Sequence, residues 1–445
     1  MSSLPRLLVI MGSGETSPTM TKTHREVLSR LGPPPVPAVL LDTPFGFQEN
    51  ADDIVARAQA YFAQSVGARV ELASFRSAEL ADALDRERFL AQVRGSRWVF
   101  AGPGSPSYAL RQWAGSGLEE LLAGKLQDGG AVTFSSAAAL TLGLVSVPVY
   151  EVYKVGEDPR WLDGLDLLSA AGLRAAVIPH YNNAEGGNHD TRYCYLGERR
   201  LRLLESQLPG GAFVLGVDEH TGVVMELETG RATVVGLGTV TIRVAGRSDV
   251  LASGTELPIA EMAVRAERLA GGGTSPGLPG ETGPPGEGRA GARTGQRGTA
   301  AMGDGRDGGR GAPCGSSPLQ DALRRSQEDF DKAMSEGDAA GAVRVVLDLD
   351  DELAAWSADT LQSDDLDRGR AVLRSMVVRL GELAELGTRD PRALVGPFVE
   401  LLVELRDRAR SEQRWEEADS IRDQLEGNSV EVRDGPQGSE WLLRG

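Results

Sequence analysis

Cysteine, histidine and long apolar runs are scarce in this chain of 445 residues, which holds two cysteines and four histidines. Cys194 and Cys314 lie far apart, which excludes a disulfide framework and a zinc site built on cysteines. This usage fits a reducing compartment, so we expect a cytoplasmic protein. No apolar run approaches the roughly 20 residues that a membrane-spanning helix needs, so we expect no membrane association.

Basic side chains are also in deficit. The chain carries 47 Lys and Arg against 64 Asp and Glu, a net charge of −17. Residues 317–445 hold 17 basic and 29 acidic side chains, whereas residues 1–270 hold 25 and 31. Attraction to a phosphate backbone requires clustered Lys and Arg. The composition therefore argues against a general nucleic-acid-binding protein, most strongly in the C-terminal part.

Residues 271–316 contain almost no large apolar side chain and are rich in glycine and proline. Glycine recurs at every third position from Gly277 to Gly286, but so short a run cannot form a collagen triple helix. A segment of this composition cannot bury enough apolar surface to offset its ordering entropy. We therefore predict a disordered linker at 271–316 between an N-terminal domain, residues 1–270, and a C-terminal module, residues 317–445.

Short apolar runs alternate with helical patterns in residues 1–270. This alternation predicts an α/β domain with a mostly parallel, doubly wound sheet covered by helices on both faces. From Phe213 to Val244, β-branched runs separated by glycine turns predict antiparallel strands at the sheet edge. The runs expected as parallel strands are Arg6–Met11, Ala38–Leu41, Arg69–Leu72, Trp98–Ala101, Ala131–Phe134 and Ala175–Ile178.

Residues 317–445 place apolar side chains at three- and four-residue spacing in several segments, the last of which is WEEADSIRDQL. This spacing is typical of amphipathic helices. The end of the chain reads SVEVRD, then the turn GPQG, then EWLL, which predicts a hairpin. We therefore expect an all-α bundle with a small β-hairpin tail.

Groups used in acyl transfer follow several of the predicted strands. Ligands bind at the carboxyl ends of parallel strands, and there the sequence places GSGET (12–16), GPGSPSY (102–108), SS (135–136) and PHYNN (179–183). Serine, histidine, carboxylates and glycine-rich loops supply a nucleophile, a base, an orienting acid and oxyanion donors. This inventory favours a hydrolase, although a strand-end histidine also occurs as a purely structural residue.

The segment AVTFSSAAALTLG (131–143) allows two interpretations. A strand, a sharp turn and a helix would form a nucleophile elbow, which lifts a serine clear of the sheet. Such turns usually keep a glycine beside the nucleophile because the backbone is strained there. Here the neighbours are Ser135, Ala137 and Ala138. The alternative is a buried strand-to-helix junction made of small residues.

These motifs resemble a known group of proteins. GSGE, AGPGSPSYALRQW, SSAAA, PHYNN, LGERRLRLLE and GVDEHTG, spread over about residues 5–246, are similar to the cyanophycinase and α-aspartyl dipeptidase group of serine peptidases. That group has the class I glutamine amidotransferase-like fold. The resemblance implies Ser136 as the nucleophile and His180 as the general base. It implies Glu219 as the orienting acid, as in cyanophycinase-like members, or Glu151, as in dipeptidase-like members. Ala138 stands where the group has glycine.

The resemblance also implies a reaction: hydrolysis of a peptide or isopeptide bond in a small, aspartyl-type peptide. A non-catalytic protein that holds a small molecule or a partner in the same pocket stays open as an alternative, and so does a homo-oligomer. The residues expected to bind the oxyanion are Gly104 and Ala137, and those expected to contact substrate are Arg111, His189, Asp190 and Arg192.

Metal and dinucleotide sites are not expected. The histidines and acidic residues between His180 and His220 lack the i, i+4 spacing of a helical zinc motif. The loop GSGETS lacks the third glycine of a dinucleotide-binding fingerprint. We therefore predict a site that works without a metal or another cofactor.

The C-terminal part has a second resemblance, over about residues 319–445. The segments DFDKAM, VELLVELRDRARSEQRWEEADSIRDQL and SVEVRDGPQGSEWLL are similar to the tail of cysteinyl-tRNA synthetases, where a helical bundle precedes a small domain that ends in a hairpin. The synthetases' ATP-binding signatures and zinc ligands have no counterpart here, which excludes aminoacylation. The family implies tRNA as a partner, but the acidic composition disfavours it, and we expect a protein partner instead.

Overall fold

The computed structural model describes residues 4–185, 189–271, 317–359, 365–388, 391–435 and 438–444. It forms two compact units, Met1–Leu319 with Glu352–Leu366, and Gln320–Asp351 with Asp367–Gly445. The linker predicted at 271–316 lies outside the described residues apart from Gly271, so its disorder stays a prediction. The segment Glu352–Leu366 follows that linker in sequence but belongs to the first unit.

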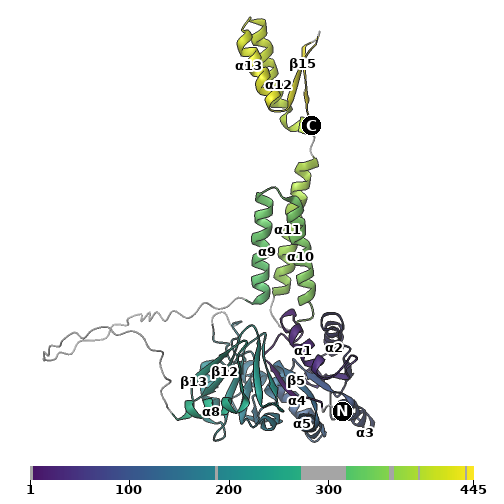
Figure 1. The fold of residues 1–445 in the computed structure, drawn as a ribbon, viewed down its shortest axis with the longest axis vertical. Coiled ribbons are helices and arrows are strands. Elements are labelled where there is room, and N and C mark those ends of the chain that lie inside the picture. The colour runs from purple at the N-terminus through teal and green to yellow at the C-terminus, as the bar shows by residue number, and fades with distance from the viewer. Residues whose placement is uncertain are drawn as a thin grey trace, which may run out of the picture. The chain divides into compact units, whose positions relative to one another are not determined.

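The first unit is built on an eight-stranded sheet in the order β14-β11-β10-β1-β5-β4-β2-β3, of which β5 is labelled in Figure 1. Strands β1, β5, β4, β2 and β3 are parallel, and β10, β11 and β14 extend the β1 side in antiparallel pairing. The mostly parallel sheet predicted from sequence is thus confirmed. Its strands are β1 (Arg6–Met11), β2 (Ala38–Leu41), β3 (Glu71–Ala73), β4 (Trp98–Ala101), β5 (Gly130–Ser135), β10 (Thr221–Glu226), β11 (Arg231–Gly236) and β14 (Glu256–Pro258).

A second sheet of the first unit has the order β13-β12-β9-β8. Here β8 (Ala175–Ile178) is parallel to β9 (Phe213–Val217), while β12 (Thr239–Val244) and β13 (Arg247–Ala252) are antiparallel. The sequence pattern suggested that β8 continues the main sheet. It does not, because β1 already pairs with β5 on one side and with β10 on the other. A short pair, β6 (Val145–Ser146) and β7 (Leu162–Asp163), completes the strands described in this unit.

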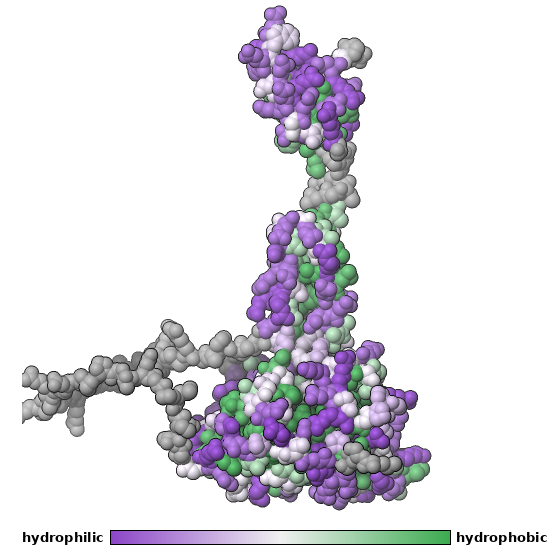
Figure 2. Space-filling model, viewed as in Figure 1, coloured by the Kyte–Doolittle hydropathy of each residue, from purple (hydrophilic) through white to green (hydrophobic). Residues whose placement is uncertain are grey.

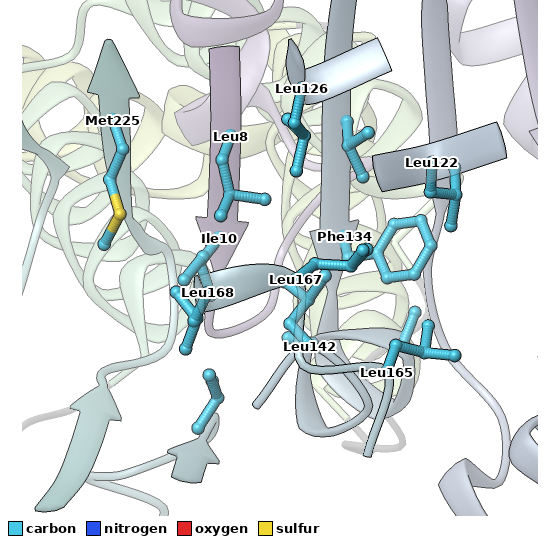
Figure 3. Packing of buried hydrophobic residues seen from close by; sticks show 14 of the residues in the cluster. Leu8, Ile10, Leu122, Leu126, Phe134, Leu142, Leu165, Leu167, Leu168 and Met225 are labelled. Carbon is cyan, nitrogen blue, oxygen red and sulfur yellow. The ribbon is translucent and has the colours of Figure 1, made fainter. Parts of the chain in front are cut away.

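Both faces of the main sheet are buried, as the alternation of side chains along β1 shows. Leu8 and Ile10 belong to one hydrophobic cluster, and Leu7 and Val9 to another, because successive side chains of a strand point to opposite faces. Figure 3 shows the first cluster, in which Phe134 of β5 lies near Leu8, Ile10 and leucines of α5. The helices are α1 (Thr21–Arg30), α2 (Ala51–Tyr61), α3 (Ala83–Gly95), α4 (Pro106–Trp113), α5 (Leu118–Asp128), α6 (Ser136–Leu140), α7 (Gly197–Ser206) and α8 (Ile259–Ala270).

The C-terminal part forms helices and a hairpin, as predicted. Residues of α12, α13 and the hairpin share a small core that includes Val399, Val403, Leu425, Val430 and Val432. In the view of Figure 2, the surface of these elements is mostly hydrophilic. The elements are α9 (Pro318–Ser335), α10 (Ala339–Trp356), α11 (Asp365–Thr388), α12 (Pro391–Ser411), α13 (Trp415–Gly427), β15 (Val430–Gly435) and β16 (Gly438–Leu443). None of the helices in the described ranges combines the length and apolar character needed to span a bilayer.

The central position of Phe134 leads to a stability prediction. Its side chain is fully buried, so Phe134→Ala removes its transfer energy and leaves a cavity. We expect the free energy of unfolding of the first unit to fall by about 3–5 kcal/mol, measured by urea denaturation of the full chain followed by circular dichroism. Leu80→Ala is the matched control, because Leu80 is 87% exposed. Equal stability of the two variants would contradict this account of the core.

Candidate active site

Three polar loops meet at one edge of the main sheet because their strands run parallel. In the β1–β5 pairing Met11 lies opposite Ser135, and in the β4–β5 pairing Ala101 lies opposite Phe134. The loops that begin at Gly12 and Gly102 therefore start beside the serine pair. The backbone N–H of Ala138 donates to the carbonyl of Gly102 at 3.0 Å, which ties the second of these loops to α6.

The two adjacent serines have different environments. Ser135 ends β5 with its side chain fully buried, and its hydroxyl donates to Oε2 of Glu15 at 2.8 Å. Ser136 has φ = 50°, a left-handed conformation that a residue other than glycine rarely adopts. Such a sharp turn between strand and helix exposes the nucleophile in an elbow. Of these two serines, Ser136 is accordingly the one that lines the pocket described below.

Ala138 occupies the position where the resembled peptidases have glycine. It lies inside α6, its side chain is fully buried, and it belongs to the same hydrophobic cluster as Phe134. The strained residue of this turn is Ser136 and not Ala138, which is absent from the left-handed residues. The added methyl group is therefore accommodated as part of the core.

Ser136, His180 and Glu219 form a continuous hydrogen-bonded series. Oγ of Ser136 lies 2.9 Å from Nε2 of His180, and Nδ1 of His180 lies 2.9 Å from Oε1 of Glu219. An ionised carboxylate only accepts hydrogen bonds, so Nδ1 carries the proton and Nε2 is free to accept from the serine hydroxyl. The Ser136–His180 distance is within the 4 Å expected for a nucleophile and its base.

Glu219 is held in place by the two asparagines of PHYNN. Its backbone N–H donates to Oδ1 of Asn182 at 2.8 Å, and Nδ2 of Asn183 donates to Oε1 of Glu219 at 3.1 Å. The parallel pairing of β8 with β9 explains this meeting, because it brings the loop after Ile178 beside the turn after Val217. The sequence PHYNN alone does not predict these two contacts, because they join two distant segments.

Electrostatics favour proton acceptance by His180. Burial opposes its protonation, but the hydrogen bond and charge of Glu219, with smaller contributions from Glu15 and Glu185, outweigh burial and raise the pKa of His180 above its ordinary value. Burial likewise opposes ionisation of Glu219, yet the bonds from His180 and Asn183 lower the pKa of that carboxyl. An imidazole next to a fixed carboxylate is what a general base in acyl transfer requires.

The series opens into a pocket of about 800 Å³, within the range of small-molecule sites. Ser136 and His180 line it together with Ser13, whose buried hydroxyl has no hydrogen-bond partner in the part of the chain that the structure describes. Its walls carry both charges: the acidic residues are Glu15, Glu185 and Asp359, and the basic residues are Arg57 and Lys154.

Gly104 and Ala137, the expected oxyanion-binding residues, both line this pocket. Gly104 has φ = 132°, and a Cβ at that position would lie 2.0 Å from the carbonyl oxygen of Pro44, so only glycine fits. Ala137 directly follows Ser136, the position whose backbone N–H serves as an oxyanion donor in elbows of this kind.

Glu151, the alternative acid, is not bonded to His180. It begins the turn Glu151–Val155, and its Oε1 accepts from the hydroxyl of Ser107 at 2.5 Å. Of the two carboxylates that the sequence left open, the structure brings Glu219 to the imidazole.

The four residues expected to contact substrate, Arg111, His189, Asp190 and Arg192, have contacts of their own in the structure. Arg111 stacks over the ring of Tyr108, and Arg192 forms an ion pair with Asp190 at 2.8 Å. His189 lies beside the ring of Tyr153. None of these four predicted residues is among the described residues that line the pocket, where Arg57 and Lys154 supply the positive charge instead. These two residues occur in ordinary helical and turn segments, which gave no sequence signal.

The remaining described histidines serve the structure. His24 is fully buried, its Nε2 lies 2.7 Å from the carbonyl oxygen of Glu15, and burial lowers its pKa to about 4. Burial also lowers the pKa of His220 to about 4. Within the ranges that the structure describes, no group of three His, Cys, Asp or Glu side chains has the arrangement of a metal site.

Comparisons with known proteins give two resemblances, and no family model matches the chain. This chain is similar to cysteine–tRNA ligase of Desulforamulus reducens. The two are 30% identical over 149 residues, which cover 29% of this chain and 30% of that protein. The same enzyme of Streptomyces coelicolor is 34% identical over 94 residues, 19% of this chain and 15% of that protein. The chain thus spans less than a third of these curated relatives.

The second resemblance is to a solved structure, a peptidase from an acI-B1 actinobacterium. It shares 20% sequence identity with this chain and has a TM-score of 0.47, covering 57% of this chain and 98% of the peptidase. Cysteinyl-tRNA synthetases, which the motifs of residues 319–445 resemble, are thus among the proteins to which the chain is similar.

The choice between the two acids can be tested on the imidazole itself. Glu219→Gln removes the charge that stabilises the protonated ring, so we expect the titration midpoint of His180 to move to lower pH. The measurement is an NMR titration of the histidine ring signals, with His180→Ala used for assignment. Glu151→Gln is the control and should leave the midpoint in place. A midpoint that moves with Glu151→Gln alone would assign the acid to Glu151.

Proposed function

We propose that the first unit is a serine hydrolase that cleaves an amide bond in a small peptide. The observation that carries this proposal is the hydrogen-bonded series Ser136–His180–Glu219, of which Ser136 and His180 line a pocket. A nucleophile, a base and an orienting acid in this order are the working parts of serine acyl transfer.

In the proposed reaction, Oγ of Ser136 attacks the scissile carbonyl carbon while Nε2 of His180 takes the hydroxyl proton. Glu219 keeps the imidazole in the tautomer with the proton on Nδ1 and stabilises the imidazolium that forms. His180 then gives its proton to the leaving amine as the carbon–nitrogen bond breaks. Water, activated by the same imidazole, hydrolyses the acyl group from Ser136 and regenerates the site.

The backbone N–H groups of Ala137 and Gly104 are the proposed donors to the oxyanion. Both residues line the pocket, and Ala137 directly follows Ser136 in α6. The left-handed turn at Ser136 holds this arrangement before substrate arrives, and such preorganised donors are a major source of catalysis.

A peptide with acidic groups is the proposed substrate class. Arg57 and Lys154 line the pocket and are the candidates for binding its carboxylates. No metal or other cofactor enters these steps.

The test of the hydrolase is reaction with a fluorophosphonate probe, which phosphonylates an activated serine. We expect the folded wild-type chain to be labelled and Ser136→Ala to lose the label completely. Ser135→Ala is the matched control and should keep it, because Ser135 is buried and bonded to Glu15. Labelling that persists in Ser136→Ala, or its absence from the folded wild-type chain, would refute the proposal and favour a non-catalytic binding protein.

For the second unit we propose a protein partner rather than tRNA. Its local arginines are paired with carboxylates: Arg406 is buried against Asp434 at 2.8 Å, and Arg410 reaches the same carboxyl at 2.6 Å. Arg414 is paired with Glu412 and Glu417. Arginines that already bind carboxylates release fewer counterions from phosphates, which supports the expectation drawn from the acidic composition.

We therefore expect the full chain to show no tight binding to total tRNA at low salt, followed by fluorescence anisotropy. Low salt strengthens phosphate contacts, so it is the most permissive condition. A cysteine–tRNA ligase serves as the positive control in the same titration. Tight association that weakens steeply as salt is added would overturn the prediction and connect the chain to tRNA.

A further inference from the structure

The segment Trp356–Asp359 begins at the last residue of α10 and belongs to the first unit, although it comes after the linker in sequence. Its backbone is turned, with the N–H of Asp359 donating to the carbonyl of Trp356 at 3.0 Å. By sequence, this segment lies within the C-terminal module predicted at 317–445, and we expected no role for it in the site.

Trp356 is buried against His220. The indole is 4% exposed and His220 is 3% exposed, and their ring centroids are 5.4 Å apart at an interplanar angle of 74°. This edge-to-face arrangement is a favourable geometry for aromatic pairs. The indole N–H donates to Oε1 of Glu352 at 2.9 Å, so both the ring plane and its polar edge are fixed.

His220 in turn fixes the turn that carries Glu219, its neighbour in sequence. Nδ1 of His220 lies 3.1 Å from Oγ1 of Thr19 and 3.3 Å from Oγ of Ser17. Gly14 has φ = 69°, and a Cβ there would lie 2.2 Å from Nδ1 of His220. The imidazole of His220 is therefore packed between the loop after β1 and the indole of Trp356.

Two further contacts join the segment to the same loop and to the pocket. Thr16 directly follows the pocket residue Glu15 in sequence, and its hydroxyl donates to the carbonyl of Ala358 at 2.6 Å. Asp359 itself lines the pocket that contains Ser136 and His180. The segment therefore contacts the turn that carries Glu219, the loop after β1 and the wall of the pocket.

We propose that Trp356 is a positioning residue of the active site, which acts through His220 on the turn that carries Glu219. The inference rests on the hydrolase function proposed above. Trp356 touches neither substrate nor the reacting atoms. It determines where the carboxylate of Glu219 stands relative to Nδ1 of His180, and a shift of about 1 Å in such a group is enough to slow catalysis by up to about a hundredfold.

The test compares Trp356→Leu, which keeps an apolar side chain but loses the aromatic edge, with Trp356→Phe, which keeps the ring. We expect Trp356→Leu to slow phosphonylation of Ser136 on the order of tenfold and to lower the titration midpoint of His180. The charged groups that act on His180 are Glu219, Glu15 and Glu185. Trp356 is uncharged, so a shift in the midpoint reports a displaced Glu219.

Trp356→Phe should react at nearly the wild-type rate with an unchanged midpoint. Trp415→Ala, which removes a tryptophan that is 56% exposed on α13, is the remote control and should also match wild type. Wild-type rate and midpoint in Trp356→Leu would overturn the inference while leaving the hydrolase intact. An unreactive wild-type chain would instead refute the hydrolase. If Trp356→Leu does not fold, as judged by circular dichroism, the test falls to Trp356→Phe. A slower phosphonylation of Ser136 and a lower titration midpoint of His180 in Trp356→Phe would then contradict the role of the ring.

Discussion

The hydrogen bond between Nδ1 of His180 and Glu219 is the interaction on which the site depends, because it orients the imidazole that connects the second sheet to Ser136 of the main sheet. His180 follows β8 of the second sheet, and Ser136 follows β5 of the main sheet. Glu219 lies in the turn where the chain leaves β9 of the second sheet and enters β10 of the main sheet. A hydrogen-bonded series at such a junction requires both sheets to be held at fixed positions.

Several neighbouring features meet that requirement. Asn182 and Asn183 hold the carboxylate from the side of β8, and His220 holds the turn from the side of the loop after β1. Trp356 supports His220 from a segment far along the chain. Each contact is an ordinary hydrogen bond or aromatic pair, yet together they leave Glu219 few alternative positions. The left-handed backbone of Ser136 is tolerated in this setting because the surrounding structure determines it.

Much of this arrangement could be predicted from sequence, and the missing parts have physical reasons. The strand-end rule places Ser136 beside the loop at Gly12, because it depends only on parallel pairing. The choice between Glu219 and Glu151 could not be made, since it depends on which loops meet across two sheets. The pairing partner of β8 was missed because a run such as AAVI fits either sheet. Arg57, Lys154 and Trp356 carry no local signal, because their roles arise from contacts between distant segments.

The central claim is that Glu219 acts on the reaction only through His180, and a double-mutant cycle tests it most directly. The rate of phosphonylation of Ser136 is measured in the wild-type chain, His180→Ala, Glu219→Gln and the double variant. The account predicts that Glu219→Gln slows the reaction when His180 is present and has no further effect in His180→Ala. A loss from Glu219→Gln that is equally large in both backgrounds would contradict it.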